Sequence, residues 1–363
     1  MLIQKFTTLF KDVTRQGTKI PKEEYLTHGK NIIIDQGQDI IAGYTNCEDG
    51  IFKKIPAIVF GDHTRIIKYV DTPFFLGADG VKVLKCTDKN ANYRYLYYAL
   101  KNAHIPNTGY NRHFKWLKEI TINYPDKNRQ NDIVNILDKL EYIIKMKSQE
   151  LDKFDELIKA RFVEMFGDPQ DSKSKWKKST IEKCCTLKSG KTLPRNIENE
   201  GGNIPYVKVK DMNSLENTTY ITTSTRFVSD KTANKSIFPV GTVIFPKRGG
   251  AIGTNKKRLT KVPICADLNI MGVIPDNTRI SSYYLFEYFN VVDLNTLNNG
   301  SSVPQINNKD INPLNINIPP LSLQNEFANF VHQVDKSKFE NIVYLNKTLS
   351  SKILSQLGDA IRD

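Results

Sequence analysis

The stretch Asn315 to Phe330 reads NINIPPLSLQNEFANF, and a near copy, TINYPDKNRQNDIVNI, runs from Thr121 to Ile136. The two segments start 194 positions apart and share a short alternating run, a proline, a glutamine and the start of an apolar-periodic stretch. Alternation is typical of a half-buried strand, and apolar residues at steps of three and four are typical of a helix. The repeat therefore predicts that the chain uses one strand-to-helix junction twice.

Each copy carries signals that end a strand and begin a helix. Pro125 and Pro319 interrupt strand pairing because proline has no backbone N–H to donate. Asn128 and Ser322 follow at positions where a short polar side chain can cap a helix. A globular block should therefore lead into a helix at each junction.

The first junction is followed by a long helical pattern. Residues 129–166 contain neither proline nor glycine, and Gly167 and Pro169 then end the pattern. A helix of about 38 residues would be roughly 57 Å long. Its apolar residues recur at steps of three and four, apart from Lys147 and Arg161 at two expected positions; they are Ile133, Leu137, Leu140, Ile144, Leu151, Phe154, Ile158 and Met165. Such a stripe is suited to packing against a partner helix.

The second junction begins a similar stripe near Ser322, formed by Phe327, Val331, Val334, Leu345, Leu349 and Leu357. Neither stripe can be buried within its own helix, so we expect the two helices to pack against each other in antiparallel orientation. A homodimeric coiled coil is the competing explanation.

The remaining blocks combine short strands with single helices. Strand-like runs include NIIID, AIVFG and GVKVLKC in the first block and IPYVKVKDM, TVIFP and IMGVIP in the second. Aromatic helix candidates lie at Tyr93 to Asn102 and Ser281 to Asn290. The pattern predicts an α+β chain with a pseudo-two-fold repeat: a first domain over 1–127, a long helix over 128–166, a second domain over 167–321 and a second long helix over 322–358.

Positive charge is concentrated in the two globular blocks. The chain carries +13 overall, with +6 in residues 1–127 and +8 in 167–321, whereas 128–166 carries −1 and 322–363 carries 0. Two basic bodies separated by nearly neutral helices suggest two contacts with one polyanion. A generally lysine-rich composition is the alternative, but it does not explain the neutral segments.

The composition also excludes several classes of protein. No apolar run approaches the roughly 18 residues of a membrane span, and the N-terminus lacks the features of a secretory signal. The five cysteines include no C-x-x-C pair, and the five histidines form no H-E-x-x-H motif. We therefore expect a cytoplasmic protein with reduced thiols and no metal site.

In the second block, the loop PKRGGAIGTNKKR combines charge with glycine. Its cations can contact phosphates, its glycines permit close backbone approach, and arginine and asparagine can pair with guanine and adenine. The candidate DNA-binding residues here are Lys247, Arg248, Gly250, Asn255, Lys256, Lys257 and Arg258, with Gln305 and Asn307 before the second junction. A phosphate-binding loop is excluded because the G-x-x-x-x-G-K-[ST] pattern is absent. A solvated basic hairpin without base contacts remains the alternative, and Gln305 and Asn307 could equally cap a turn.

The first block offers corresponding positions. The segment TGYNRHFKWLKE mixes aromatic, amide and basic groups, and the residues after AIVFG occupy the place of Lys247 and Arg248 after TVIFP. The candidates are Asp62, His63, Arg65, Tyr110, Asn111, Arg112 and His113. Tyr110 could also belong to the core, as we expect for Trp116.

No catalytic constellation emerges from the sequence. The run NIPP, Asn317 to Pro320, differs in order from the N-P-P-[YF] element of adenine methyltransferases, and Leu321 stands where an aromatic would stack a flipped base. There is no glycine-rich cofactor loop after a first strand, and no paired-carboxylate nuclease pattern has convincing spacing. The preferred interpretation is that the chain has no activity of its own.

Three stretches resemble the specificity subunit of type I restriction–modification systems. They are SSVPQINNKDINPLNINIPPLSLQNEFANFV (Ser301 to Val331), GTVIFPKRGGAIGTNKKR (Gly241 to Arg258) and FVEMFGDP (Phe162 to Pro169). The first junction departs from the family pattern, since YPDKNRQ stands where a double proline is expected. The resemblance spans nearly the whole chain.

The resemblance implies a non-catalytic, DNA-binding subunit. Two target recognition domains would each read one half of a bipartite, asymmetric target, and the two helices would form a coiled-coil stalk that sets their spacing. The subunit would dock two adenine-N6 methyltransferase subunits, and in a full complex also restriction subunits. S-adenosylmethionine, ATP and Mg would belong to those partners and not to this chain.

Two other classes of function remain as alternatives. One is a self-sufficient enzyme that modifies or cleaves DNA through an unrecognised site. The other is a homodimeric coiled-coil scaffold whose basic domains bind RNA or an acidic protein.

Overall fold

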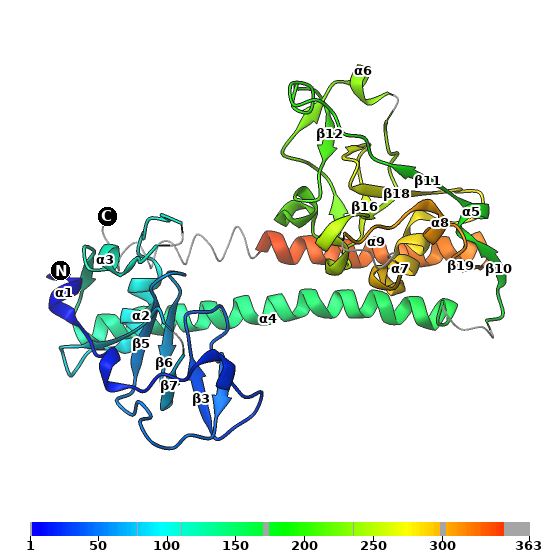
Figure 1. Cartoon of the computed structure of the whole chain (residues 1–363). Coiled ribbons are helices and arrows are strands. Elements are labelled where there is room, and N and C mark those ends of the chain that lie inside the picture. The colour runs from blue at the N-terminus through cyan, green and yellow to red at the C-terminus, as the bar shows by residue number, and fades with distance from the viewer. Residues whose placement is uncertain are drawn as a thin grey trace. The chain divides into compact units, whose positions relative to one another are not determined.

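The computed structural model describes residues 2–77, 79–109, 111–169, 174–234, 236–297 and 303–344 (Figure 1). The chain divides into two compact units. The first contains the residues up to Gln149 together with those from Asn341 onward, and the second contains Glu150–Glu340. Each unit has its own sheets and its own hydrophobic core.

The first unit begins with the paired strands β1 and β9, continues in a four-stranded sheet of order β2-β8-β5-β6, and adds a three-stranded sheet of order β4-β3-β7. Its elements are β1 (Leu2–Lys5), α1 (Phe6–Leu9), β2 (Phe10–Asp12), η1 (Thr14–Gln16), η2 (Lys22–Glu24), β3 (Asn31–Ile34), β4 (Gly43–Thr45), β5 (Ala57–Gly61), β6 (Ile67–Val70), β7 (Phe74–Leu76), β8 (Val81–Cys86), α2 (Tyr93–Lys101), α3 (Phe114–Leu117) and β9 (Thr121–Tyr124).

The second unit has the paired strands β10 and β19, a five-stranded sheet of order β11-β18-β15-β16-β13 and a three-stranded sheet of order β14-β12-β17. Its elements are β10 (Lys177–Thr180), α5 (Ile181–Cys184), β11 (Cys185–Ser189), β12 (Ile204–Val207), η3 (Asp211–Asn213), η4 (Leu215–Asn217), β13 (Tyr220–Ile221), β14 (Phe227–Val228), α6 (Asp230–Ala233), β15 (Val243–Pro246), η5 (Gly249–Thr254), β16 (Arg258–Thr260), β17 (Cys265–Ala266), β18 (Ile270–Pro275), α7 (Ser282–Val291), η6 (Leu294–Leu297), α8 (Asn308–Ile311) and β19 (Asn315–Ile318).

The two units share most of their topology, although the main sheet of the second has the additional strand β13. The junction strand of each pairs antiparallel with the first strand of its own unit, β9 with β1 and β19 with β10. The small sheet of each contains one parallel pair, β3 with β7 and β12 with β17. An aromatic helix follows the main sheet in each, α2 capped by the Asn92 side chain and α7 capped by that of Ser281. The repeat seen at the junctions therefore extends over both domains, as the α+β interpretation predicted.

The two longest helices of the described residues follow the junctions. Helix α4 (Lys127–Phe166) has 40 residues and α9 (Leu321–Tyr344) has 24. The expected end of the second helix at 358, together with Leu345, Leu349 and Leu357, lies outside the described residues.

Within the second unit, α9 packs against the last turns of α4 in antiparallel orientation. Arg161 of α4 forms an ion pair with Glu326 near the start of α9, whereas Asp155, earlier in α4, pairs with Lys338, later in α9. The apolar residues that this pairing buries are Ile158, Phe162, Phe166, Phe327, Val331 and Val334, with Phe154 and Met165 partly buried beside them; Leu151 is half-buried.

The first half of the α4 stripe contacts the domain that precedes it. Ile133, Leu137 and Leu140 are buried in the core of the first unit, together with α2, and Ile144 packs at its edge. The reason is the junction itself: a helix that starts directly after β9 has its first turns over the domain that β9 belongs to. These residues therefore join the domain to its helix. Packing of the second long helix on this half of the stripe stays a prediction.

A search of the described residues finds no helix with both the length and the apolar character needed to cross a bilayer.

Candidate nucleic-acid interface

Three loops of the first unit converge at one end of its main sheet. They are the η1 turn after β2, the loop after β5 and the segment before α3. The backbone amide of His113 donates to the carbonyl of Asp62 over 2.8 Å, and the amide of Phe114 donates to the Asp62 side chain over 2.7 Å. The loops enclose a hollow of about 660 Å³, which we call the first groove. The side chains that line it include Asp12, Arg15, Lys19, Asp62, Asp79, Lys82 and Arg112.

The first groove carries more positive than negative side chains at its rim. Lys19 pairs with Asp79 at 2.6 Å and Lys82 with Asp12 at 3.2 Å. The bond from Lys19 holds the pKa of the Asp79 carboxyl below its usual value. Arg15 and Arg112 are exposed in addition. A concave surface with exposed guanidinium groups suits phosphates and the acceptor atoms of guanine.

The second unit brings the equivalent loops together. The amide of Ile306 donates to the carbonyl of Lys247 over 2.9 Å, which matches the bond from His113 to Asp62 in the first unit. Arg248 forms a β-bridge with Gln305, so the loop after β15 lies beside the segment before α8. The Lys247 ammonium donates to the Ser189 hydroxyl at the end of β11 over 2.7 Å. We call Ser189, Lys247, Arg248 and Gln305 the second cluster.

The glycine-rich loop after β15 folds back on the domain. Gly249 has a φ of +68° and Asn255 a φ of +52°, so both ends of η5 use the left-handed region. Gly250 has open space around it. The Asn255 side-chain oxygen accepts from the Lys257 ammonium over 2.7 Å and from the Leu294 amide over 2.9 Å. The Asn255 side-chain oxygen therefore already accepts hydrogen bonds from groups of its own domain.

The cations at the end of this loop are largely internal. Lys257 is 4% exposed and also donates to the carbonyl of Val292 over 2.6 Å, and its burial lowers its pKa to about 8. The Arg258 guanidinium donates to the carbonyls of Met212, Asn217 and Lys257. Lys256 donates to the Asn213 side chain. DNA contact by these residues stays a prediction, and within this loop the exposed cation is Arg248.

Most candidates of the first unit have structural roles as well. Asp62 and His113 are buried, and the His113 ring nitrogens lie 3.0 Å from the Asp62 carbonyl and 3.3 Å from the Thr108 hydroxyl. Arg65, at a φ of +64°, donates to the Ile105 carbonyl over 3.1 Å. The amide of His63 donates to the Gln36 side chain over 3.2 Å. Of these residues, Asp62 lines the first groove, while Arg65 lines a separate hollow beside Ile105.

The remaining candidates lie at the surface or cap a helix. Asn111 and Arg112 are exposed, and Tyr110 lies outside the described residues. The Gln305 amide donates to the Asn307 side chain over 2.7 Å, and the Asn307 backbone amide donates to the Asp310 carboxylate at the start of α8 over 2.8 Å.

A second repeat in the sequence marks basic residues that are absent from our candidates. QGTKIP (Gln16 to Pro21) and SGKTLP (Ser189 to Pro194) occupy the same place after β2 and β11. Each contains a glycine, a lysine and a proline in the same order. A comparison of the two halves beyond the junctions would have singled out Lys19, which lines the first groove, and Lys191 in the second unit.

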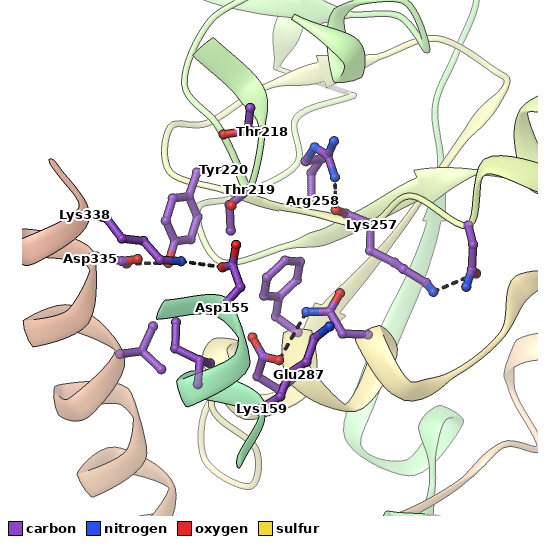
Figure 2. A pocket seen from close by; sticks show the side chains of 15 residues that line it. Asp155, Lys159, Thr218, Thr219, Tyr220, Lys257, Arg258, Glu287, Asp335 and Lys338 are labelled. Atoms are coloured by element: carbon purple, nitrogen blue, oxygen red, sulfur yellow. Dashed lines mark hydrogen bonds and ion pairs between the residues drawn. The ribbon is translucent and has the colours of Figure 1, made fainter. Parts of the chain in front are cut away.

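A second cavity, of about 270 Å³, lies within the second unit where α4 and α9 meet α7 and the strands β13 and β16 (Figure 2). The Tyr220 hydroxyl donates to Asp335, and Lys338 pairs with Asp155. Glu287 on α7 is 8% exposed, and burial raises its pKa to about 7. One ion pair and one hydrogen bond thus connect acidic side chains at this cavity to neighbouring groups, and no three of the described acidic, histidine or cysteine residues are arranged to hold a metal ion.

Comparisons with known proteins agree with this architecture. The family model described as "Type I restriction modification DNA specificity domain" matches residues 8–153 and 173–350. The specificity subunit of the type I restriction enzyme EcoR124I/EcoR124II from Escherichia coli is 24% identical over 330 residues, which cover 84% of this chain and 79% of that protein. The MjaIX specificity subunit of Methanocaldococcus jannaschii is 22% identical over 268 residues, and the match covers 68% of this chain but 59% of that protein.

Solved structures show the same fold at low identity. The S subunit of a type I restriction–modification system from M. genitalium has a TM-score of 0.57 and 19% identity, and the match covers 100% of this chain and 96% of that one. A chain from a structure concerned with complex assembly and conformational transition of a type I restriction–modification system has a TM-score of 0.54 and 14% identity, with coverage of 98% and 96%.

Proposed function

This chain belongs to the type I restriction–modification DNA specificity family, and on that premise we propose that its two domains each read one half of a bipartite DNA target. The chain is a non-catalytic specificity subunit, which removes the self-sufficient enzyme as an alternative. Its partners, as the family implies, are DNA together with methyltransferase and restriction subunits, and we propose two methyltransferase subunits for each chain. S-adenosylmethionine, ATP and Mg would act in those partners.

The observation that carries the proposal is the duplicated loop arrangement. In each unit, the carbonyl of the residue after one strand of the main sheet accepts a hydrogen bond from a backbone amide in the segment before a short helix. Asp62, after β5, accepts from His113, and Lys247, after β15, accepts from Ile306. The first arrangement presents the exposed Arg112, beside the exposed Arg15, and the second presents the exposed Arg248. Two domains that bind different half-sites need the same backbone arrangement with different side chains.

We further propose that α4 and α9 set the distance between the half-sites. At about 1.5 Å per residue, 40 residues of α4 measure roughly 60 Å, on the order of two turns of duplex at about 34 Å per turn. A helix of that length is suited to a target with an unread gap.

The decisive experiment compares Arg112→Ala with Arg248→Ala in the chain bound to its methyltransferase subunits. Methylation of a duplex library would be sequenced for each complex. We expect each variant to relax the preference at one position of its own half-site by about 1–3 kcal/mol, because an arginine pair with guanine contributes about that much discrimination.

Arg129→Ala serves as the control, since this exposed arginine in the first turn of α4 lines neither the first groove nor the second cluster. It should leave both half-site preferences intact. The proposal fails if Arg112→Ala and Arg248→Ala affect the same half-site, or if neither changes sequence preference.

A further inference from the structure

A buried glutamine occupies the same place at both junctions. Gln130 lies in the first turn of α4 and is 2% exposed, and Gln324 lies in the first turn of α9 and is 0% exposed. They are the two copies of the glutamine in the repeated stretch. Glutamine is mostly found at protein surfaces, so its complete burial at both equivalent sites calls for a specific role.

In the first unit, the Gln130 side chain joins three elements. Its oxygen accepts from the backbone amide of Asn92, the N-cap of α2, over 3.1 Å. Its NH₂ group donates to the carbonyl of Pro125, which follows β9, over 2.9 Å. One side chain of the spacer helix therefore binds both the aromatic helix and the end of the junction strand.

In the second unit, Gln324 makes the same pair of bonds. Its oxygen accepts from the amide of Ser281, the N-cap of α7, over 2.7 Å. Its NH₂ group donates to the carbonyl of Pro319 over 2.8 Å and to that of Arg279 over 3.1 Å. The arrangement, which we call the glutamine clasp, is thus present independently in two domains of different sequence.

Only a side-chain amide satisfies this geometry without charge. It offers an acceptor and two donors on one planar group, whereas a carboxylate lacks the donor and an apolar side chain lacks both. Removing the side chain would leave a buried N–H and a buried carbonyl without partners, which is costly. The clasp therefore favours one orientation of the helix start relative to its own domain.

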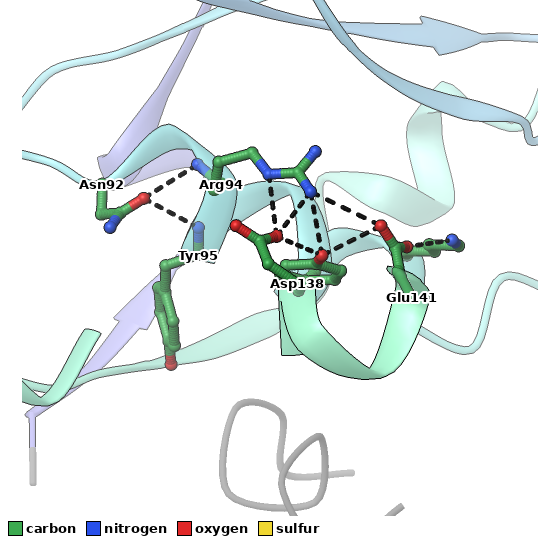
Figure 3. A network of polar contacts seen from close by, with 7 residues as sticks. Asn92, Arg94, Tyr95, Asp138 and Glu141 are labelled. Atoms are coloured by element: carbon green, nitrogen blue, oxygen red, sulfur yellow. Dashed lines mark hydrogen bonds and ion pairs between the residues drawn. The ribbon is translucent and has the colours of Figure 1, made fainter. Parts of the chain in front are cut away.

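Further contacts in the first unit hold the same two helices together. Figure 3 shows Arg94 of α2 directed at Asp138 and Glu141 of α4, with Arg94 2.5 Å from the Asp138 carboxylate. The Asn92 side chain also donates to Asn131 over 2.8 Å. The clasp lies where α4 begins to pack against α2. A small change in the angle of α4 at this point would displace the far end of the helix by a larger distance.

We propose that Gln130 and Gln324 are positioning residues that fix the angle between each recognition domain and its spacer helix, and thereby restrict the gap lengths that the subunit accepts. This inference rests on the proposed function. One extra base pair moves a half-site by about 3.4 Å and rotates it by roughly 34° about the duplex axis. A domain held at one angle discriminates against that change, and a domain free to tilt does not.

The test uses the full chain in complex with its methyltransferase subunits, with Gln130→Met and Gln324→Met made separately. Duplexes carry the native half-sites with the native gap or with a gap one base pair longer or shorter, and initial methylation rates are compared. We expect each methionine variant to lower the rate ratio of native to altered gap by about tenfold, with base preferences within the half-sites unchanged.

Tyr95→Phe and Tyr284→Phe are matched controls. The hydroxyls of these tyrosines donate to the carbonyls of Asn123 and Asn317 over 2.6 and 2.9 Å. Each substitution therefore removes a buried hydrogen bond beside the clasp but keeps the ring, and with it the packing of Tyr284 on Phe162 and Phe166 of α4. The controls should keep the gap preference of the unaltered chain. If a methionine variant does not fold, the corresponding Gln→Glu variant, which keeps the acceptor, is measured in the same way.

Two outcomes would overturn the role of the clasp: an unchanged gap ratio in the glutamine variants, or an equal loss of gap preference in the tyrosine controls. Failure of the proposed function looks different, because the unaltered complex would then methylate all three gap lengths alike.

Discussion

Glu287 is a carboxylic acid held away from water on α7. Charged groups face it from two helices, Lys159 and Asp155 from α4 and Lys338 from α9, while Asn290 donates to its carboxylate over 3.2 Å. Burial is the largest influence and raises the pKa of Glu287 from 4.5 to about 7. The ionised form is therefore disfavoured in the folded chain.

The raised pKa of Glu287 makes the folded chain less stable as pH rises. The cost of ionising Glu287 is absent below pH 4.5, grows as pH rises towards 7 and stays constant above it. We expect Glu287→Gln to raise the free energy of unfolding relative to the unaltered chain by up to about 3 kcal/mol at pH 8, at 1.36 kcal/mol per pKa unit, and by much less at pH 5. Urea denaturation at a series of pH values measures it.

The exposed Glu340 on α9 provides the control. Glu340→Gln should show no such pH-dependent gain. A stabilisation by Glu287→Gln that is independent of pH, or greatest in acid, would contradict the assignment.

At the residue scale, the sequence predicted which loop carries the positive charge but not the tertiary contacts of its side chains. The run at Lys256 to Arg258 looked like a phosphate-binding patch, yet the Lys257 and Arg258 side chains bind backbone carbonyls of their own domain. The difference lies in tertiary packing, because a cation in a loop can face solvent or fold inward with the same local sequence. Arg112 and Arg248 were named as DNA-binding candidates, and both are exposed, but their contact with DNA stays a prediction.

The pairing of α4 with α9 depends on aromatic packing. Phe327 of α9 is 0% exposed, and its ring centroid lies 5.5 Å from that of Phe162 and 5.6 Å from that of Phe166. We expect Phe327→Ala to lower the free energy of unfolding of the second unit by about 3–5 kcal/mol, because it leaves a cavity in a close-packed core. Thermal and urea denaturation of the full chain would measure the loss.

Phe339 on the same helix is the matched control, since it is 66% exposed. Phe339→Ala should change the free energy of unfolding by no more than about 0.5 kcal/mol. Similar losses for both variants would mean that Phe327 does not hold α9 to α4.

The existence of two long helices and their antiparallel pairing were predictable at the element scale, but the contacts made by the first half of α4 were not. The three-and-four spacing correctly indicated a long amphipathic α4. It could not indicate that Ile133 and Leu137 face α2 while Ile158 and Phe162 face α9, because periodicity reports that a face is buried and not what covers it. The glutamine clasp was visible in the sequence as a repeated residue, but its hydrogen bonds needed the fold.

For the molecule as a whole, an internal duplication explains the architecture. Each unit repeats the same strand pairing, the same aromatic helix and the same junction, while the loops that form the first groove and the second cluster differ in sequence. Net charges of +6 and +8 in the two globular blocks suit contact with the same polyanion at two places. The two copies of the stretch that opens at Thr121 and Asn315 were sufficient to predict this organisation, because a repeated junction implies a repeated domain.

Sequencing the methylated adenines in cells that express this chain with its methyltransferase subunits tests the central claim most directly. We predict a single methylated motif with two short specified halves of different sequence, separated by unspecified bases of constant number. A continuous motif with no unread gap, or two halves of identical sequence, would contradict the account of two unlike readers on one chain.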